Sequence, residues 1–316
     1  MPDLPLPAIF GFLTALSLLI YIVLDGYDLG VGILSVFADE CERNTMIATI
    51  APFWDANETW LILAGGLVLT AFPLAQGVIF GALYAPTTIL LVAILFRGVA
   101  FDFRSKAKEK NKTFWNVSLF AGSLAIAAAQ GYMLGMFVTG FRTTWLVALA
   151  TVMAVLAYCL VGAAWLIMKT GGGLRTHAGK WGIGALRLAI VSILAWVAVE
   201  YGELAVRADL MPFIYAGGAL AVLLVFAWRH ATHRSGASWL PFVLCILLFA
   251  DVVAAISLYC YPYIVYGQMT LEEGAASEEA LLILLAGALV TLPLAILYSV
   301  VAYRIFHGRH ESSSCE

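Results

Sequence analysis

The chain has 316 residues, of which 63% are hydrophobic and only 12% are charged. Soluble domains contain about 45–50% apolar and about 25% charged residues, so this composition excludes a soluble protein and predicts a polytopic membrane protein. The net charge of −3 excludes nothing by itself, because the orientation of a membrane protein depends on where along the chain its charges lie.

Apolar runs of about 20 residues, each long enough to cross a bilayer, follow one another along the sequence. We expect an all-α fold of about nine transmembrane helices in a single integral membrane domain over residues 1–316, because short connections join the runs. No basic stretch of a cleaved signal peptide precedes the first run, which should therefore remain as a helix. The predicted spans are Pro7–Val36, Asp55–Phe72, Gly77–Ala100, Phe114–Val138, Thr144–Met168, Gly182–Val199, Met211–Trp228, Trp239–Ile264 and Glu279–Phe306.

Basic residues are concentrated in alternate connections between these spans. One set of connections, together with the C-terminal segment, contains Arg43, Arg104, Lys106, Lys108, Lys110, Lys112, Lys169, Arg175, Lys180, Arg229, Arg234, Arg304 and Arg309. The opposite set contains only Arg142 and Arg207, beside an acidic loop that begins at Glu272. The positive-inside rule therefore predicts an N-terminus outside and a C-terminus in the cytoplasm.

Two acidic pairs lie within or beside the first two apolar runs. Asp25 and Asp28 interrupt the first run, and Asp55 and Glu58 open the second. The i, i+3 spacing places both carboxyl groups of a pair on one face of a helix. An ionisable group at membrane depth costs at least about 2.5 kcal/mol on insertion scales, so such groups commonly mark an ion or proton path. We predict that the four acids form the cytoplasmic entrance of a proton path.

An ion-pair cluster that fixes helix packing is the alternative interpretation of these acids. Arg43 in the first connection and Arg97 near the inner end of the third span are the candidate counter-charges, and the sequence leaves this alternative open. Asp102 and Arg104 follow Arg97 and are expected to form an ion pair at the rim of the same span. Gly26 and Gly30 add a GxxxG pattern beside the first pair, which is typical of closely packed helices.

Asp251 lies near the middle of the eighth span, with no basic residue close to it in sequence. A single carboxyl at that depth must be protonated, hydrated or paired with another helix. Two interpretations remain open, a second proton or water pocket and a protonated packing residue.

The five histidines fall in predicted loops or at helix ends: His177, His230, His233, His307 and His310. Membrane haem proteins commonly ligate iron by histidines within their helices, and the cysteines show no metal-binding spacing. We therefore expect no metal site and no bound cofactor in this chain alone, and any redox metals should belong to a partner. No phosphate-binding loop and no dinucleotide motif occurs, so neither soluble nucleotide chemistry nor a nucleic-acid partner is expected.

The acids lie in motifs that are specific in combination. Residues 25–32 read DGYDLGVG, residues 51–61 read APFWDANETWL, and residues 95–104 read LFRGVAFDFR. The tail adds Tyr261-Pro262-Tyr263 and Tyr303-Arg304-Ile305-Phe306. This series resembles subunit II of the cytochrome bd-type quinol oxidases, including the cyanide-insensitive branch. The motifs cover about the first third of the chain, whereas the middle third is similar to the family only in hydropathy and helix count.

The resemblance implies a heterodimer with a haem-bearing subunit I in a bacterial cytoplasmic (inner) membrane, in many cases with a small single-helix subunit. Such a complex oxidises quinol, reduces dioxygen to water with protons taken from the cytoplasm, and carries its b-type and d-type haems in subunit I. The family associates the aspartate of its WD motif, here Asp55, with proton entry, and it fills the position of Glu58 variably. Some members hold a structural quinone in this subunit; Trp54, Trp60 and Phe101 could flank one, but we assign no quinone site from the sequence.

A proton-coupled secondary transporter is the rival hypothesis from another class. Intramembrane acids and nine helices suit a transporter, which would also show inverted repeats and paired broken helices. The sequence shows no convincing repeat, which favours the oxidase subunit.

Overall fold

The computed structural model describes residues 5–204, 211–233, 237–306 and 308, and nearly all of them are helical. The elements, in chain order, are α1 (Leu6–Leu34), η1 (Ser35–Phe37), α2 (Glu40–Ile50), α3 (Trp54–Ala71), α4 (Pro73–Ala82), α5 (Tyr84–Arg104), α6 (Glu109–Val138), α7 (Trp145–Lys169), α8 (Gly172–Leu204), α9 (Met211–His233), α10 (Leu240–Cys260), β1 (Tyr263–Val265), β2 (Met269–Thr270), α11 (Leu271–Gly274) and α12 (Glu278–Ile305). An all-α membrane fold is thereby confirmed.

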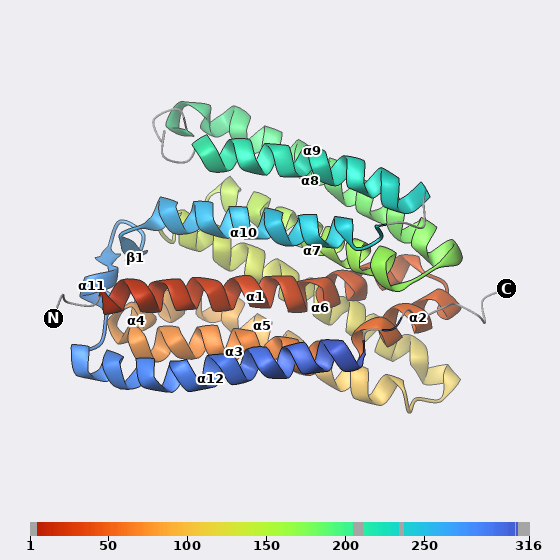
Figure 1. The fold of residues 1–316 in the computed structure, drawn as a ribbon, viewed down its shortest axis with the longest axis horizontal. Coiled ribbons are helices and arrows are strands. Elements are labelled where there is room, and N and C mark those ends of the chain that lie inside the picture. The colour runs from red at the N-terminus through yellow and green to blue at the C-terminus, as the bar shows by residue number, and fades with distance from the viewer. Residues whose placement is uncertain (1–4, 205–210, 234–236, 307, 309–316) are drawn as a thin grey trace.

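The long helices run side by side in one elongated bundle (Figure 1). Helix α1 lies in its middle and packs against α3, α6, α7 and α10, whereas α8 and α9 form an outer layer on one side. Helix α2 lies at one end of the bundle, and α11 lies with β1 at the other. The start of α1 and the end of α12 lie at opposite ends. This central position explains why the second half of α1 is buried although it carries two aspartates.

Within the described residues, seven helices are long and apolar enough to cross a membrane: α1, α5, α6, α7, α8, α10 and α12. Helix α3 has 18 residues, but Asp55, Asn57 and Glu58 lie in its first two turns and lower its hydropathy. The apolar part of α9 that meets the length criterion for a shorter helix is Tyr215–Ala231. The chain is therefore a multi-pass membrane protein, and the count of nine spans stays a prediction.

The third predicted span, Gly77–Ala100, is wrong at its N-terminal end. The structure has two helices there, α4 and α5, which meet at Leu83. Pro86 in the first turn of α5 has no N–H to donate to the carbonyl of Ala82, which favours an interruption of the helix at this point. Pro73 similarly lies at the first position of α4, where its missing N–H costs nothing.

Several other predicted boundaries differ from the helix ends by four to ten residues. Helix α8 begins at Gly172, ten residues before the predicted start at Gly182, because tertiary contacts hold its polar first turns: Arg175 donates to the carbonyl of Ala231, and His177 contacts Glu42 at 2.8 Å. His177 therefore lies on a helix rather than in a loop.

Helix α10 ends at Cys260, before the predicted Ile264, because Pro262 cannot continue it. The sequence analysis did not foresee the short antiparallel pair of β1 and β2 that follows. Thr270 then caps α11: its backbone N–H and its hydroxyl donate to the Glu273 carboxylate at 2.8 and 3.0 Å, which lowers the pKa of that carboxyl.

Helices α1 and α7 approach each other so closely that their backbones touch. A Cβ on Gly30 would lie 1.8 Å from the carbonyl oxygen of Tyr158, and one on Gly162 would lie 2.6 Å from the backbone of Gly30. Only glycine fits at such a crossing, which is the physical basis of the glycine pattern in transmembrane helices. The crossing lies next to the turns of α1 that contain Asp25 and Asp28, and both of these residues are buried.

We expect Gly30→Ala to lower the free energy of unfolding by about 1–3 kcal/mol, because the added methyl group must displace α7. The thermal unfolding temperature of the purified protein, detected as the onset of aggregation on heating, would measure the effect. Gly184→Ala on α8 is the matched control, since a Cβ there meets no atom within 4 Å. Equal transition temperatures for the two variants would contradict this interpretation of the crossing.

Candidate functional site

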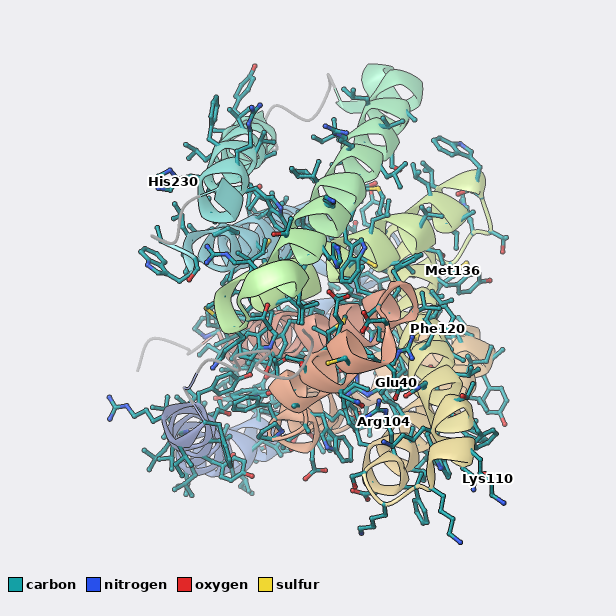
Figure 2. The ribbon with its side chains drawn as sticks, turned by 90° about the vertical axis from the view of Figure 1, so that its right-hand side faces the viewer. Glu40, Arg104, Lys110, Phe120, Met136 and His230 are labelled. Atoms are coloured by element: carbon teal, nitrogen blue, oxygen red, sulfur yellow. The ribbon has the colours of Figure 1, made fainter. Side chains whose placement is uncertain are left out.

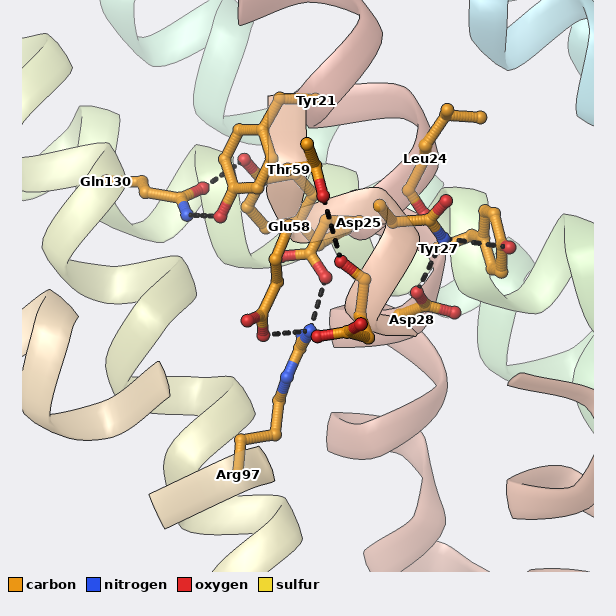
Figure 3. Close-up of polar contacts among 12 residues, drawn as sticks. Tyr21, Leu24, Asp25, Tyr27, Asp28, Glu58, Thr59, Arg97 and Gln130 are labelled. Atoms are coloured by element: carbon orange, nitrogen blue, oxygen red, sulfur yellow. Dashed lines mark hydrogen bonds and ion pairs between the residues drawn. The ribbon is translucent and has the colours of Figure 1, made fainter. Parts of the chain in front are cut away.

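The centre of the candidate site is Arg97, a fully buried arginine on α5. Its Nη2 donates to Oε1 of Glu58 on α3 at 2.7 Å and to Oδ1 of Asp25 on α1 (Figure 3). The side chain of Asp25 is fully buried, and that of Glu58 is 13% exposed. One guanidinium therefore joins three helices that are far apart in sequence.

Small residues allow α5 to present Arg97 in this position. A Cβ on Gly122 of α6 would lie 3.3 Å from the Cβ of Arg97, so α6 can pass close behind the arginine. A Cβ on Gly98 would lie 3.2 Å from the ring of Trp54, which stacks on Phe101 with ring centroids 5.2 Å apart. Trp54 and Phe101, two of the three aromatic residues considered as quinone neighbours, thus pack on each other.

Asp28 is held by a second set of hydrogen bonds next to this centre. Nδ2 of Asn57 donates to Oδ2 of Asp28 at 2.8 Å and lies 3.1 Å from the Tyr27 hydroxyl. Tyr303 of α12 donates to Oδ1 of Asn57 at 3.2 Å, and its hydroxyl oxygen lies 2.5 Å from that of Tyr27. The sequence analysis missed Asn57 and Tyr303 as site residues, although both lie in quoted motifs.

Four buried polar atoms of this cluster have no hydrogen-bond partner in the described part of the chain: Oδ2 of Asp25, Oδ1 of Asp28, and Nε and Nη1 of Arg97. Buried polar groups are normally paired, and those without a protein partner are commonly satisfied by internal water. The cluster therefore has free donors and free acceptors directed into one buried region.

The charges of the cluster do not balance if every group is ionised. Asp25, Asp28 and Glu58 would carry three negative charges against the single positive charge of Arg97. Burying unpaired charge costs several kcal/mol per ion, so a neutral state of this cluster requires bound protons. Its chemistry is therefore that of a site that can take up and release protons.

Asp55 lies one turn before Glu58 but outside this cluster. Its side chain is exposed and lines a hollow between α3 and α12, together with Thr59, Trp60, Tyr298 and Ser299, among others. The structure thus brings three of the four predicted acids together and places the fourth at the surface beside them. Whether Asp55 transfers protons stays a prediction.

The prediction of an ion pair between Asp102 and Arg104 at the end of α5 is wrong within the described residues. Asp102 is exposed, and Arg104 contacts the carboxylate of Glu40 at 3.2 Å. Arg104 also donates to Asn116 and to Asn44 at 2.6 and 2.7 Å. Figure 2 shows Glu40 and Arg104 together at this end of the bundle, with Lys110 at its edge.

Arg43, the other candidate counter-charge, pairs with Glu40 at 2.7 Å and not with the buried acids. Asp251 on α10 is half-buried, and its Oδ2 would lie 2.8 Å from a Cβ on Gly217, so it faces α9. Neither interpretation of Asp251 is decided by this position.

No group of three or more His, Cys, Asp or Glu side chains that could hold a metal ion occurs among the described residues. His177 contacts Glu42, His230 is exposed near the end of α9, and His307 and His310 lie outside the described residues. The three cysteines of the apolar runs, Cys159, Cys245 and Cys260, are buried in helices. The expectation that haems belong to a partner stays a prediction.

Residues 6–306 match the family model described as "Cytochrome bd terminal oxidase subunit II". The chain belongs to this family. This subunit II is 27% identical to cytochrome bd-I ubiquinol oxidase subunit 2 of Escherichia coli K12, over 95% of this chain and 94% of the relative. It is 28% identical to cytochrome bd ubiquinol oxidase subunit 2 of Bacillus subtilis, over 92% of each chain.

A solved bd oxidase structure from Geobacillus thermodenitrificans contains a chain with the same fold. The TM-score is 0.80 at 19% identity, and the match covers 96% of this subunit II and 99% of that chain. The sequence resemblance to the bd-type oxidases is therefore confirmed, and the transporter hypothesis is not favoured.

We expect Arg97→Gln to be strongly destabilising, by about 3–5 kcal/mol, because it leaves the buried carboxylates without their counter-charge. The yield of assembled complex and its thermal inactivation would measure the effect. Arg142→Gln is the matched control, since the Arg142 side chain is exposed and surface charges contribute at most about 1 kcal/mol. An Arg97→Gln protein as stable as this control would refute the central role of the arginine.

Proposed function

We propose that this chain is the non-haem subunit of a bd-type quinol:dioxygen oxidoreductase, a terminal oxidase of aerobic respiration. The family match over residues 6–306 is the observation that carries this proposal. The subunit would support a haem-bearing subunit I in the bacterial inner membrane and supply part of the route by which cytoplasmic protons reach the site of dioxygen reduction. A small single-helix subunit, membrane lipid, quinol and dioxygen are the other expected partners of the complex.

The buried cluster supports the proton route. Asp55 lines an accessible hollow, Glu58 follows one turn later at the edge of the cluster, and Asp25 lies behind it across Arg97. Groups of this kind, bridged by water at the unpartnered atoms, can pass a proton in short steps. Asp28 lies beside this route, and its hydrogen bond from Asn57 would influence how readily the neighbouring acids bind a proton.

Redox chemistry would come from the b-type and d-type haems of subunit I. This chain's own part is to hold and move protons at carboxylate oxygens and to keep bulk water out of the core of its bundle. We assign no structural quinone here, because two of the three candidate aromatic residues pack on each other.

The proposed orientation has nine spans, the N-terminus outside and the C-terminus in the cytoplasm. Two features support it: the start of α1 and the end of α12 lie at opposite ends of the bundle, and Arg104 and Lys110 lie at the end where α12 finishes. In this orientation α2 and the hollow beside Asp55 lie towards the cytoplasm.

We expect Asp55→Asn to slow dioxygen consumption by up to about 100-fold, the lower end of what a positioned proton-transfer group contributes. Assembly should change much less, because the side chain is exposed. Quinol-driven dioxygen uptake per haem is the measurement. Asp102→Asn, the same change at an exposed aspartate of α5, should leave the rate unchanged; wild-type turnover in well-assembled Asp55→Asn complex would remove Asp55 from the route.

The oxidase assignment is tested by purifying the tagged chain in mild detergent and recording reduced-minus-oxidised visible spectra. We expect haem bands only when a second large subunit is purified with it, and none when this chain is expressed alone. Haem bound by the lone chain would overturn the non-haem assignment. Absence of both haem and partner from preparations of native membranes would overturn the oxidase assignment itself.

A further inference from the structure

A chain of hydrogen bonds lies next to the cluster and joins α1 to α6 and α7. Nε2 of Gln130 on α6 donates to the Tyr21 hydroxyl at 2.5 Å, and Oε1 of Gln130 accepts from the Tyr158 hydroxyl on α7. Tyr21 and Tyr158 are buried, with 1% and 5% of their surface exposed. Figure 3 shows Gln130 beside Tyr21, above Asp25.

We infer that Tyr21, Gln130 and Tyr158 are positioning residues of the proposed proton route, which orient the Asp25 carboxylate through this directed chain. The inference rests on the proposed function, because it assigns these residues a role in turnover. This chain is separate from the network already described, in which Tyr27 and Tyr303 contact Asn57 and Asn57 donates to Asp28.

The chain has a direction that follows from its donors and acceptors. The carbonyl oxygen of Gln130 has no proton, so Tyr158 must be the donor in that contact. The Tyr21 oxygen accepts from the Gln130 amide, so the proton of the Tyr21 hydroxyl is left for a further acceptor.

Asp25 is the acceptor that the geometry offers to Tyr21. The two residues are four positions apart on α1 and so lie on the same face, one turn from each other. Oδ2 of Asp25 is buried and has no hydrogen-bond partner among the described residues, whereas Oδ1 accepts from Arg97. No direct hydrogen bond joins Tyr21 to Asp25, so the inferred contact runs through an internal water between the Tyr21 hydroxyl and Oδ2. With this contact on Oδ2 and Arg97 on Oδ1, both oxygens of Asp25 are positioned.

The close crossing of α1 and α7 sets the position of Tyr158. A Cβ on Gly26 would lie 2.9 Å from the ring of Tyr158, so any larger residue would displace that ring. Gly26 and Asp25 are neighbours in sequence, and the glycine therefore couples the packing of α7 to the acid. This gives the glycine of the DGYD motif a role beside the carboxylates, beyond helix packing.

The test is a double-mutant cycle in the intact oxidase complex. Tyr21→Phe, Asp25→Asn and the double variant are compared for thermal inactivation and for the kcat and KM of quinol-driven dioxygen uptake. We expect Tyr21→Phe to lower kcat about tenfold with little change in KM, in line with the loss of one hydrogen bond to a charged group. It should have little further effect in the Asp25→Asn background, since neighbouring residues in one network are not additive.

Tyr132→Phe is the matched control, because Tyr132 lies on α6 two residues after Gln130 and packs in the separate cluster around Met136 and Val147. If Tyr21→Phe does not assemble, Tyr158→Phe removes the hydroxyl at the other end of the chain and is used in the same cycle. Additive effects of the two changes on both thermal inactivation and kcat would overturn the inference. Non-additive effects on thermal inactivation together with an unchanged kcat would also overturn the inference, because they would show that Tyr21 contributes to packing alone. If Asp25→Asn itself leaves kcat unchanged, Asp25 is removed from the proposed route, whatever Tyr21→Phe does.

Discussion

The buried guanidinium of Arg97 is the constraint on which the rest of this structure depends. An arginine cannot give up its proton in a protein, so its burial requires negative partners. Those partners, Asp25 and Glu58, come from α1 and α3, and the ion pairs hold three helices in one rotational setting. The hydrogen bonds of Asn57 and Gln130 to residues of α1 lie next to this ion-pair centre.

The surrounding networks extend from this centre in two directions. On one side, Asn57 links Asp28 to Tyr27 and to Tyr303 of the last helix. On the other side, Gln130 links Tyr21 to Tyr158. Both networks include residues of α1, so this central helix takes part in the buried hydrogen bonds on both of its sides. The close crossing at Gly30 allows α7 to take part, since a larger residue would hold it too far away.

The two acids at the start of α3, Asp55 and Glu58, lie in different environments although they are one turn apart. Glu58 faces inward and shares Arg97 with Asp25, whereas Asp55 faces a hollow that α12 completes. A proton route needs both kinds of group, one open to water and one in contact with the buried acids. The family resemblance associates Asp55 with proton entry, whereas the geometry places Glu58, which the sequence analysis had also named, in contact with the arginine of the buried acids.

The sequence by itself determined the class of protein, the all-α fold and the family. Composition and apolar run length are sufficient for the first two, because the bilayer leaves few structures that satisfy every backbone group. The motifs around residues 25–32, 51–61 and 95–104 were sufficient for the third. Spacing within a helix also predicted that Asp25 and Asp28 would share a face.

Only the tertiary structure decided which acids meet. Helical periodicity relates residues within one helix, but the rotation of each helix against its neighbours depends on the packing of the whole bundle. For that reason Asp55 and Glu58, three residues apart, could not be distinguished from the sequence. The contacts of Asn57 with Asp28, of Tyr303 with Asn57 and of Gln130 with Tyr21 were likewise not foreseen. The break at Leu83 and the early start of α8 depend on a proline and on contacts between distant segments. Position in the assembled bundle, more than residue type, determines which polar groups of this subunit are buried together.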